Sequence, residues 1–337
     1  MNNMLIKVTF ISGLKEVVLH EMSRYPKLKI YEEGDEEIYL DLSSDFKILT
    51  ELKSIINIYV IKRSDEFNPY FISKHKSVLG EIIDIVLKGS TDKFKTFRLS
   101  CAGSDSKEVK EIKDFIIQTY KLTSENEADL DIFIGKANSS WEVGVRLTSR
   151  PLTLRDYRVE NIKGGLNPTV AYAMNSFCEL DSAHSYLNIF SGSATLLIEA
   201  GLINKNLRLV GFDSNGKSNA LAVENIKKAG LIKLIQLKTA DIFNKPDLGS
   251  FDVIASDLPF GMQISKDEDL KKLYQCFVEY SEEFLNSKGT LVVYTTEHKL
   301  LTSILDKSKF KIIKLFDLKV STVVGAYIYP KIFVCKF

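Results

Sequence analysis

The chain has 337 residues, of which 45% are hydrophobic and 26% are charged, and its formal net charge is +1. This length exceeds the usual size of one domain, so we expect two or three domains, each with its own core. Residues 1–160 carry 24 basic and 26 acidic side chains, which excludes a polybasic body that holds nucleic acid through bulk charge.

The spacing of the cysteines and histidines, and the lack of a long apolar run, exclude further classes of protein. The four cysteines lie far apart without a Cys-x-x-Cys pair, which favours reduced thiols over a disulfide framework or a zinc site. The four histidines form no spacing typical of metal ligands, so no metal is expected. We find no apolar run that could span a bilayer and no leader at Met1, and therefore expect a cytoplasmic protein.

Residues 1–66 are expected to form a ferredoxin-like domain. Apolar residues that alternate or recur with helical spacing predict a strand, a helix, two strands, a helix and a strand over 4–10, 14–25, 28–31, 37–42, 46–52 and 56–61. This β-α-β-β-α-β order is that of a small ferredoxin-like unit.

Residues 67–158 are expected to form a second α+β domain, which begins at the break Asn68-Pro69. Its predicted helices and strands cover 70–87, 94–101, 106–120, 129–134 and 140–147. Four segments resemble a THUMP domain, the RNA-binding module of several tRNA- and rRNA-modifying enzymes: 95–100, 128–131, 141–147 and 152–158. The last is similar to the "L..RGYR" signature, with Asp156 where glycine is usual.

Residues 159–337 are expected to form an α/β domain after a polar linker that ends in Gly164-Gly165. Predicted strands cover 185–190, 207–213, 232–239, 251–257, 289–295, 310–318 and 326–336, and predicted helices 194–203, 217–229, 269–285 and 300–306. This alternation predicts a doubly wound, mostly parallel, seven-stranded sheet of Rossmann-like type. The final strand is expected to be antiparallel, with a bulge or late start at Pro330.

Open α/β sheets bind ligands beyond the carboxyl ends of their strands, and the first strand of this domain runs into small residues there. The GxGxxG spacing of a NAD site is absent. Residues 187–200 instead resemble motif I of RNA methyltransferases, "DPFCGSGTILIEA", with departures at Asn188, Ile189, Ser191 and Ala194. The resemblance implies that this segment binds S-adenosylmethionine through Asn188, Ser191, Gly192, Ser193 and Thr195. The alternative is an ordinary β-α turn.

The next two strand ends carry one carboxylate each. Asp213 ends the second strand, where an acidic residue can accept both hydroxyls of a ribose. Its segment resembles the family pattern "G.D......A..N...AG". Asp241 follows the third strand, where a carboxylate suits the exocyclic amine of adenine and Ile242 and Phe243 would flank the ring. A helix cap is the alternative role for either aspartate.

The fourth strand end, Asp257-Leu258-Pro259-Phe260, resembles motif IV of amino-methylating enzymes, "(N/D/S)-P-P-(Y/F/W)". An exocyclic base amine is a poor nucleophile because its lone pair is delocalised into the ring. Asp257 and a backbone carbonyl held by Pro259 can accept hydrogen bonds from both N–H groups and so orient the amine. Phe260 offers a face for a base that has left its helix. On its own, the tetrapeptide is equally compatible with a simple exit from a strand.

The whole chain resembles the THUMP-containing guanine-N2 methyltransferases of tRNA. This implies N2-methylguanosine as the product, and position 6 in the acceptor stem is favoured. The expected RNA contacts are basic residues near the second domain: Lys93, Lys95, Arg98, Arg150, Arg155 and Arg158. Three alternatives stay open: a 23S rRNA guanine-N2 methyltransferase, a DNA adenine methyltransferase, and a THUMP protein that binds RNA without catalysis because its motif I has changed.

Overall fold

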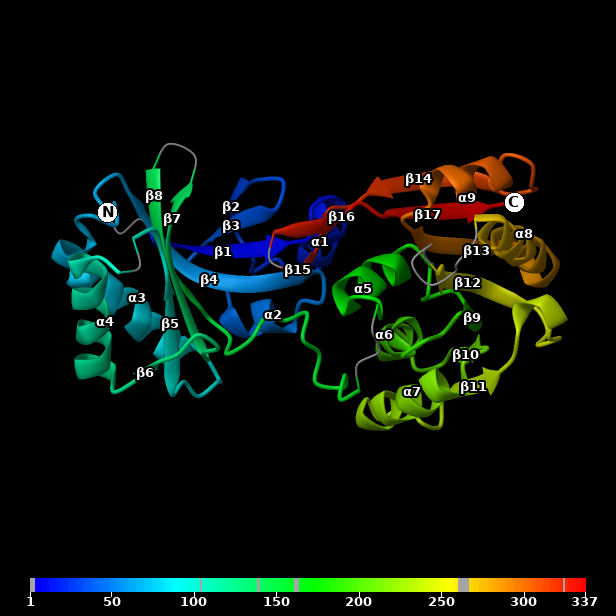
Figure 1. The fold of residues 1–337 in the computed structure, drawn as a ribbon, viewed down its shortest axis with the longest axis horizontal. Coiled ribbons are helices and arrows are strands. Elements are labelled where there is room, and N and C mark those ends of the chain that lie inside the picture. Colours follow the sequence, from blue (N-terminus) through cyan, green and yellow to red (C-terminus); the bar gives the residue numbers. More distant parts are fainter. Residues whose placement is uncertain (1–3, 104, 138–139, 161–163, 260–266, 324) are drawn as a thin grey trace. The chain divides into compact units, whose positions relative to one another are not determined.

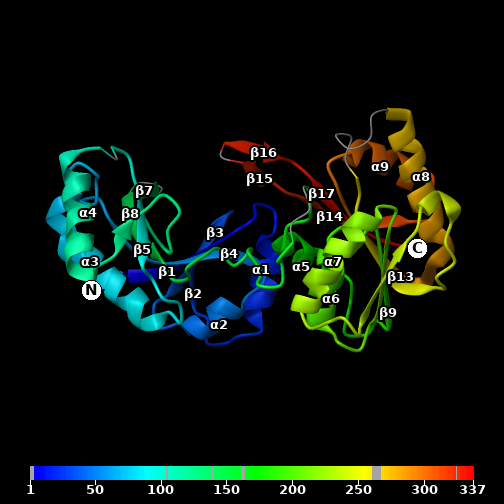
Figure 2. The same ribbon diagram turned by 60° about the horizontal axis from the view of Figure 1, so that its bottom comes forward.

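A computed structural model describes residues 4–103, 105–137, 140–160, 164–259, 267–323 and 325–337, apart from the side chains of residues 267, 268 and 323. The chain forms two compact units. Unit 1 consists of Met1–Phe10 and Val18–Leu152, and unit 2 consists of Ile11–Val17 and Thr153–Phe337. Most of unit 1 is blue to cyan in Figures 1 and 2, and most of unit 2 is green to red.

Unit 1 is built on one eight-stranded sheet with the order β2-β3-β1-β4-β8-β7-β5-β6. The strands are β1 (Met4–Phe10), β2 (Ile30–Glu33), β3 (Glu37–Asp41), β4 (Ile55–Ser64), β5 (Thr96–Ser100), β6 (Thr123–Ser124), β7 (Leu130–Ala137) and β8 (Ser140–Arg146). The helices are α1 (Lys15–Ser23), α2 (Phe46–Glu51), η1 (Ile72–His75), α3 (Lys76–Gly89) and α4 (Lys107–Tyr120). Strands β4 and β8 pair directly, so the two segments expected as separate domains share a sheet. Their division near residue 66 stays a prediction.

The two faces of this sheet differ in chemistry because successive side chains of a strand point to opposite sides. On β1, Ile6 is fully buried and packs in a core that includes Val18 of α1. The neighbouring Lys7 lies on the opposite face, where its Nζ donates a hydrogen bond to Glu142 at 2.9 Å. Arg63 donates to the same carboxylate at 2.9 Å, so this nearly fully buried acid is doubly paired.

Unit 2 contains the predicted seven-stranded sheet, in the order β11-β10-β9-β12-β13-β17-β14. Its strands are β9 (Ser185–Ile189), β10 (Arg208–Asp213), β11 (Ile235–Thr239), β12 (Phe251–Asp257), β13 (Leu285–Thr295), β14 (Lys311–Asp317) and β17 (Lys331–Lys336). The helices are α5 (Pro168–Ser176), α6 (Thr195–Ile203), α7 (Gly216–Lys228), η2 (Ile242–Asn244), α8 (Asp267–Phe284) and α9 (His298–Leu305). Strand β17 is antiparallel to both neighbours, which confirms the expected mostly parallel sheet with an antiparallel final strand.

Helices cover both faces of this sheet, with α5, α6 and α7 on one side and α8 and α9 on the other (Figures 1 and 2). The α8 side buries three large aromatic side chains, Tyr274, Phe277 and Tyr280, against the strands. The central strands β9 and β12 are almost continuously apolar because both of their faces are covered. No described helix combines the length and the apolar character needed to cross a membrane.

The end of the chain departs from the sequence prediction of one strand over 326–336. Pro330 has no N–H to donate and separates β16 (Ala326–Ile328) from β17, so the long strand starts late, at Lys331. Strand β15 (Val320–Val323), which was not predicted, pairs antiparallel with β16. The carbonyl of Pro330 accepts the N–H of Leu318 at 2.9 Å and closes the base of this hairpin.

Candidate active site

A cavity of about 540 Å³ lies at the carboxyl ends of the parallel strands in unit 2. Strand β9 has β10 on one side and β12 on the other, so the order of the sheet switches there. The volume falls in the range of small-molecule sites. The cavity is lined by nine of the predicted site residues: Asn188, Ser191, Gly192, Ser193, Thr195, Asp213, Asp241, Ile242 and Asp257. Pro259 lines it too, whereas Phe260 lies outside the described residues.

The loop between β9 and α6 makes a sharp turn at the cavity wall. Phe190, Gly192 and Ala194 have positive φ angles of 58°, 50° and 61°, a region that costs a residue with a Cβ about 1–2 kcal/mol. Ala194 is fully buried and is the N-cap of α6, to which it gives no side-chain cap. The first N–H groups of α6 are therefore left for other acceptors, as suits a polar or anionic ligand.

Asp213 joins this loop to the end of β10. Its Oδ2 accepts the N–H of Gly192 at 3.0 Å, and its Oδ1 accepts the N–H of Asn215 at 2.8 Å. Gly211 allows the close approach of the loop, because a Cβ there would lie 3.0 Å from the Cβ of Ser191. A carboxylate oxygen has more than one lone pair, so Asp213 can also accept ligand hydroxyls while it holds the loop.

Asp241, which follows β11, also lines the cavity. Its Oδ1 accepts the N–H of Phe243 at 3.0 Å, so it does cap the short helix η2. The second oxygen of a capping aspartate keeps its acceptor capacity, which leaves the predicted contact with an adenine amine possible. Ile242 is 2% exposed and gives the cavity an apolar wall, whereas Phe243 is 55% exposed.

Asp257 stands at the end of β12 with an unsatisfied carboxylate oxygen. Its Oδ1 is buried and has no hydrogen-bond partner among the described residues. Burial raises the pKa of this carboxyl group to about 8. An unpaired buried acceptor costs about 1–3 kcal/mol, a cost that a ligand with N–H donors would remove. The geometry therefore favours a binding role over a simple strand exit.

Tyr274 of α8 holds the residues that follow Asp257. Its hydroxyl donates a hydrogen bond to the carbonyl of Pro259 at 3.0 Å and lies 2.7 Å from Oγ1 of Thr295. The N–H of Leu258 donates to the carbonyl of Tyr294 at 2.9 Å, so the turn is fixed from two sides. Sequence reasoning missed Tyr274, because the helical spacing of α8 identifies it only as a core residue.

Residues 155–325 match the family model described as "RMKL-like, methyltransferase domain". This segment covers half of the chain and contains every residue that lines the cavity. The chain belongs to this methyltransferase family. This family agrees with the resemblance expected from the sequence. The cavity at the carboxyl ends of the strands therefore belongs to a methyltransferase domain.

Curated relatives of this methyltransferase carry names of guanine-N2-methylating enzymes. The U6 snRNA (guanine-N(2))-methyltransferase THUMPD2 of Bos taurus is 31% identical over 171 residues, which cover 50% of this chain and 32% of the relative. The tRNA (guanine(6)-N2)-methyltransferase of Archaeoglobus fulgidus is 25% identical over 204 residues, covering 53% of this chain and 52% of the relative. The chain thus spans between a third and about half the length of these relatives.

A solved structure extends the likeness of the fold to both units. The crystal structure of TrmN from Thermus thermophilus superposes with a TM-score of 0.77 and 20% identity, and the match covers 99% of each chain. At this identity the likeness shows the fold alone. It confirms the α/β fold predicted from the strand and helix pattern.

The cavity of the methyltransferase fits S-adenosylmethionine. This molecule presents an ammonium group, two ribose hydroxyls and an adenine amine, all of which donate hydrogen bonds. The cavity offers carboxylate acceptors for the ribose and the adenine amine at two separate strand ends, on Asp213 and Asp241. Among the described residues, no group of three or more His, Cys, Asp or Glu side chains is arranged to hold a metal ion.

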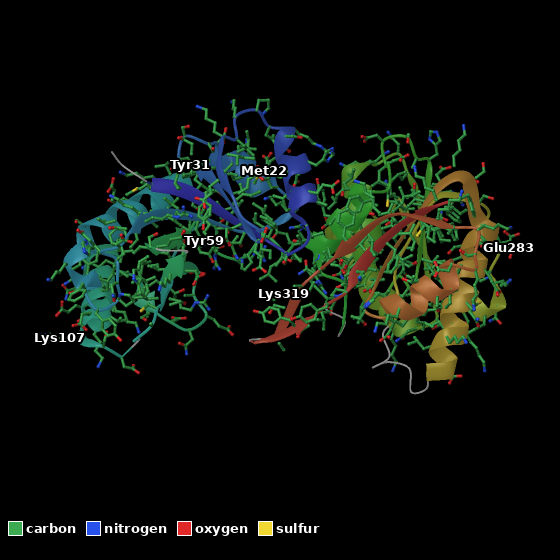
Figure 3. All side chains as sticks on the ribbon, turned by 90° about the horizontal axis from the view of Figure 1, so that it is seen from above. Met22, Tyr31, Tyr59, Lys107, Glu283 and Lys319 are labelled. Atoms are coloured by element: carbon green, nitrogen blue, oxygen red, sulfur yellow. The ribbon has the colours of Figure 1, made fainter. Side chains whose placement is uncertain are left out.

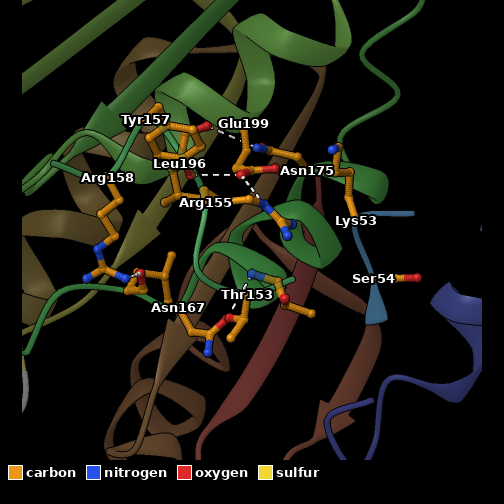
Figure 4. A network of polar contacts seen from close by, with 12 residues as sticks. Lys53, Ser54, Thr153, Arg155, Tyr157, Arg158, Asn167, Asn175, Leu196 and Glu199 are labelled. Atoms are coloured by element: carbon orange, nitrogen blue, oxygen red, sulfur yellow. Dashed lines mark hydrogen bonds and ion pairs between the residues drawn. The ribbon is translucent and has the colours of Figure 1, made fainter. Parts of the chain in front are cut away.

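Two arginines expected to contact RNA form hydrogen bonds within unit 2 (Figure 4). Arg155 is 8% exposed, and its Nε lies 3.1 Å from Oε1 of the buried Glu199 on α6. The hydroxyl of Tyr157 donates to the same oxygen at 2.7 Å. Arg158 donates to the carbonyls of Gly165 and Leu166, and burial lowers its pKa. Both arginines are thus engaged within unit 2, and their contact with RNA stays a prediction.

The remaining predicted RNA contacts belong to unit 1. Lys93, Lys95 and Arg98 are exposed and precede or lie on β5. Arg98 is paired with Asp131 at 2.8 Å, which reduces the charge that it presents. Arg150 is exposed just after β8. Their contact with RNA stays a prediction.

Proposed function

We propose that this methyltransferase transfers a methyl group from S-adenosylmethionine to the exocyclic N2 of guanine in a structured RNA. Position 6 of the tRNA acceptor stem is the favoured target. The observation that carries the proposal is the buried, unpaired Oδ1 of Asp257 at the wall of a cavity that three other strand ends also reach. The names of the curated relatives support guanine N2 as the acceptor.

Residues at the other strand ends would hold the cofactor. Asp213 accepts hydrogen bonds from the ribose, Asp241 accepts one from the adenine amine, and Ile242 packs against the ring. Ser193 and Thr195, at the start of α6, line the same cavity. S-adenosylmethionine, when bound, supplies an electrophilic methyl group on a positively charged sulfur.

Asp257 and the turn after it would orient the guanine. The carboxylate accepts a hydrogen bond from one N–H of the N2 amine, and a backbone carbonyl of residues 257–259 accepts the other. Tyr274 fixes this turn through the carbonyl of Pro259. With a pKa of about 8, the Asp257 carboxylate is also a better proton acceptor than an ordinary aspartate, so Oδ1 can take the proton that the amine loses.

The test is a methyl-transfer assay with S-adenosylmethionine labelled on the methyl group, followed by nucleoside analysis of the RNA. We expect labelled N2-methylguanosine in a tRNA transcript and none when guanine 6 is replaced. Transcripts of U6 snRNA and 23S rRNA separate the alternative substrates. The Asp257→Ala variant is expected to lose activity and keep its cofactor affinity, and a large loss of cofactor binding would contradict the assigned role.

A non-catalytic RNA-binding protein is the second candidate, and Asn188 favours it. This side chain is buried, and its amide donates to the carbonyls of Ile189 and Ala255 at 3.1 and 2.9 Å. It thus brings no negative charge to the cofactor ammonium, where the family motif has aspartate. Calorimetry separates the candidates: absence of binding at millimolar S-adenosylmethionine supports the second and removes the first.

A further inference from the structure

The hairpin β15–β16 rises from the edge of the sheet that carries the active site. Strand register shows this directly, because Asp257 pairs with Tyr294, the adjacent Thr295 pairs with Lys331, and Lys331 pairs with Asp317. The hairpin begins just after Asp317 and ends just before Lys331. It therefore extends beyond the same edge of the sheet at which Asp257 lies. Neighbouring strands are about 4.8 Å apart, which places the base of the hairpin about 10–14 Å along the edge from β12.

The position of this hairpin is fixed by contacts at its base. The carbonyl of Pro330 accepts the N–H of Leu318 at 2.9 Å, and the N–H of Lys319 donates to the carbonyl of Ser12 at 3.3 Å. Lys331 and Asp317 form an ion pair at 2.7 Å across the two strands that support it. The hairpin is therefore held in register with the sheet.

Two tyrosines on the hairpin are largely uncovered. Tyr327 is 49% exposed and Tyr329 is 63% exposed, and their spacing of two residues places them on one side of an extended segment. The residue opposite Tyr327 is Ser321, which is too small to cover the ring. Lys319 is exposed, and its Nζ lies 4.5 Å from the centre of the Tyr327 ring. Figure 3 shows Lys319 on this hairpin.

The charge of the surrounding segment is strongly basic. Residues 298–337 contain eight lysines and two acidic residues, a net charge of +6 in a chain whose total is +1. Both acidic residues are exposed, and one of them, Asp317, is neutralised by Lys331. Three further exposed lysines, at 307, 309 and 311, lie before or at the start of β14, at the end of this strand that is away from the hairpin. Lys314 and Lys336 pair with Glu16 and Glu179 outside the segment, and a polyanion complements the basic side chains that remain, among them Lys319 on the hairpin itself.

We propose that Lys319, Tyr327 and Tyr329 form a platform for the RNA substrate beside the target nucleotide. The tyrosine rings stack on bases that lose their neighbours when the target guanine leaves the helix, and Lys319 contacts a phosphate. Stacking on aromatic rings tolerates any base, so the platform contributes to affinity and placement rather than to sequence choice. This inference rests on the proposed function, because it requires RNA at the cavity edge.

The test uses the full chain and a tRNA transcript, with direct RNA binding measured separately from methyl transfer. We expect Tyr327→Ala with Tyr329→Ala to raise the Kd for the transcript at least tenfold, and Lys319→Ala to raise it about threefold. The matched control replaces both tyrosines by phenylalanine, which keeps the rings, and is expected to stay within twofold of the parent. Lys233→Ala, at an exposed lysine outside the hairpin and the basic segment, controls for loss of one charge.

Cofactor affinity and melting temperature should not change in any of these variants, since the three residues are exposed. Equal RNA affinity of the double alanine variant and the parent overturns the platform, as does an equal loss in the phenylalanine control. A variant that loses association with another protein but keeps its RNA affinity also overturns it. RNA binding that depends on the tyrosines without any methyl transfer keeps the platform and removes the proposed function.

Discussion

The Asp257→Asn variant tests the chemistry of the site, because the environment of this carboxylate sets a pH dependence. With a pKa of about 8, about one tenth of the Asp257 side chains are ionised at pH 7. We therefore expect kcat/KM for RNA to rise about tenfold between pH 7 and pH 9.5 when the cofactor is kept below its KM, so that the free protein sets the pKa. Burial raises the pKa of both Tyr274 and Tyr294 well above the usual range, so these neighbours stay neutral in that interval.

Asparagine keeps the shape of the side chain but cannot ionise. At pH 9, kcat/KM of the variant should be about 10²- to 10³-fold lower than that of the parent, a loss within the range for a positioned proton acceptor. Its remaining activity should not vary with pH between 7 and 9.5. The assay is initial-rate transfer of labelled methyl groups to a tRNA transcript across this pH range. A flat profile for the parent, or a rise that persists in Asp257→Asn, refutes the assignment.

The same group makes a prediction for stability. Its pKa is raised in the folded state, so the folded chain binds the proton more tightly than the unfolded chain does. The stability from the protonated form is complete below about pH 4, the unfolded pKa, and is lost as the pH rises to about 8. Because the side chain borders the open cavity, we expect the free energy of unfolding to fall by about 1–3 kcal/mol, which is less than a shift of four pKa units alone would give. Asp257→Asn should therefore melt above the parent at pH 8 and level with it at pH 4.

Three further substitutions probe the packing around the cavity. Ala194→Gly should raise the free energy of unfolding by about 1 kcal/mol, since glycine adopts the positive φ of this position without strain; a lower melting temperature would contradict this. Tyr274→Phe removes the donor to the carbonyl of Pro259 and should lower kcat about tenfold at unchanged cofactor affinity; an unchanged kcat would show that the turn is held without it. Glu199→Gln removes the carboxylate that pairs with the buried side chain of Arg155 and should destabilise unit 2 by about 3 kcal/mol, most of which is recovered by adding Arg155→Met; additive losses in a double-mutant cycle would refute the pairing.

The sheet of unit 2 and its cavity could be predicted because local patterns determine both. Apolar runs alternate with helical spacing, and a parallel sheet brings the ends of β9, β10 and β12 to one edge. Residues at the carboxyl ends of those strands, such as Asp213 and Asp257, therefore lie at the same edge, although they are far apart in the sequence.

Other features depend on pairs of residues that no local pattern connects. Arg155 belongs to a signature that resembles an RNA-binding module, yet it pairs with Glu199, 44 residues later, inside unit 2. The hydroxyl of Tyr274 donates a hydrogen bond to the carbonyl of Pro259. The apolar spacing around Tyr274 predicts only a helix and does not indicate this contact. The hairpin β15–β16 escaped prediction because its strands have only four and three residues, although Pro330 indicated an interruption there.

The central claim is methyl transfer to guanine N2, and nucleoside mass spectrometry of a treated tRNA transcript tests it most directly. The purified chain, S-adenosylmethionine and the transcript should yield N2-methylguanosine at position 6, and the Asp257→Ala protein should yield none. A product methylated on adenine or cytosine, or no product from the parent with tRNA, U6 snRNA or 23S rRNA transcripts, would contradict the account.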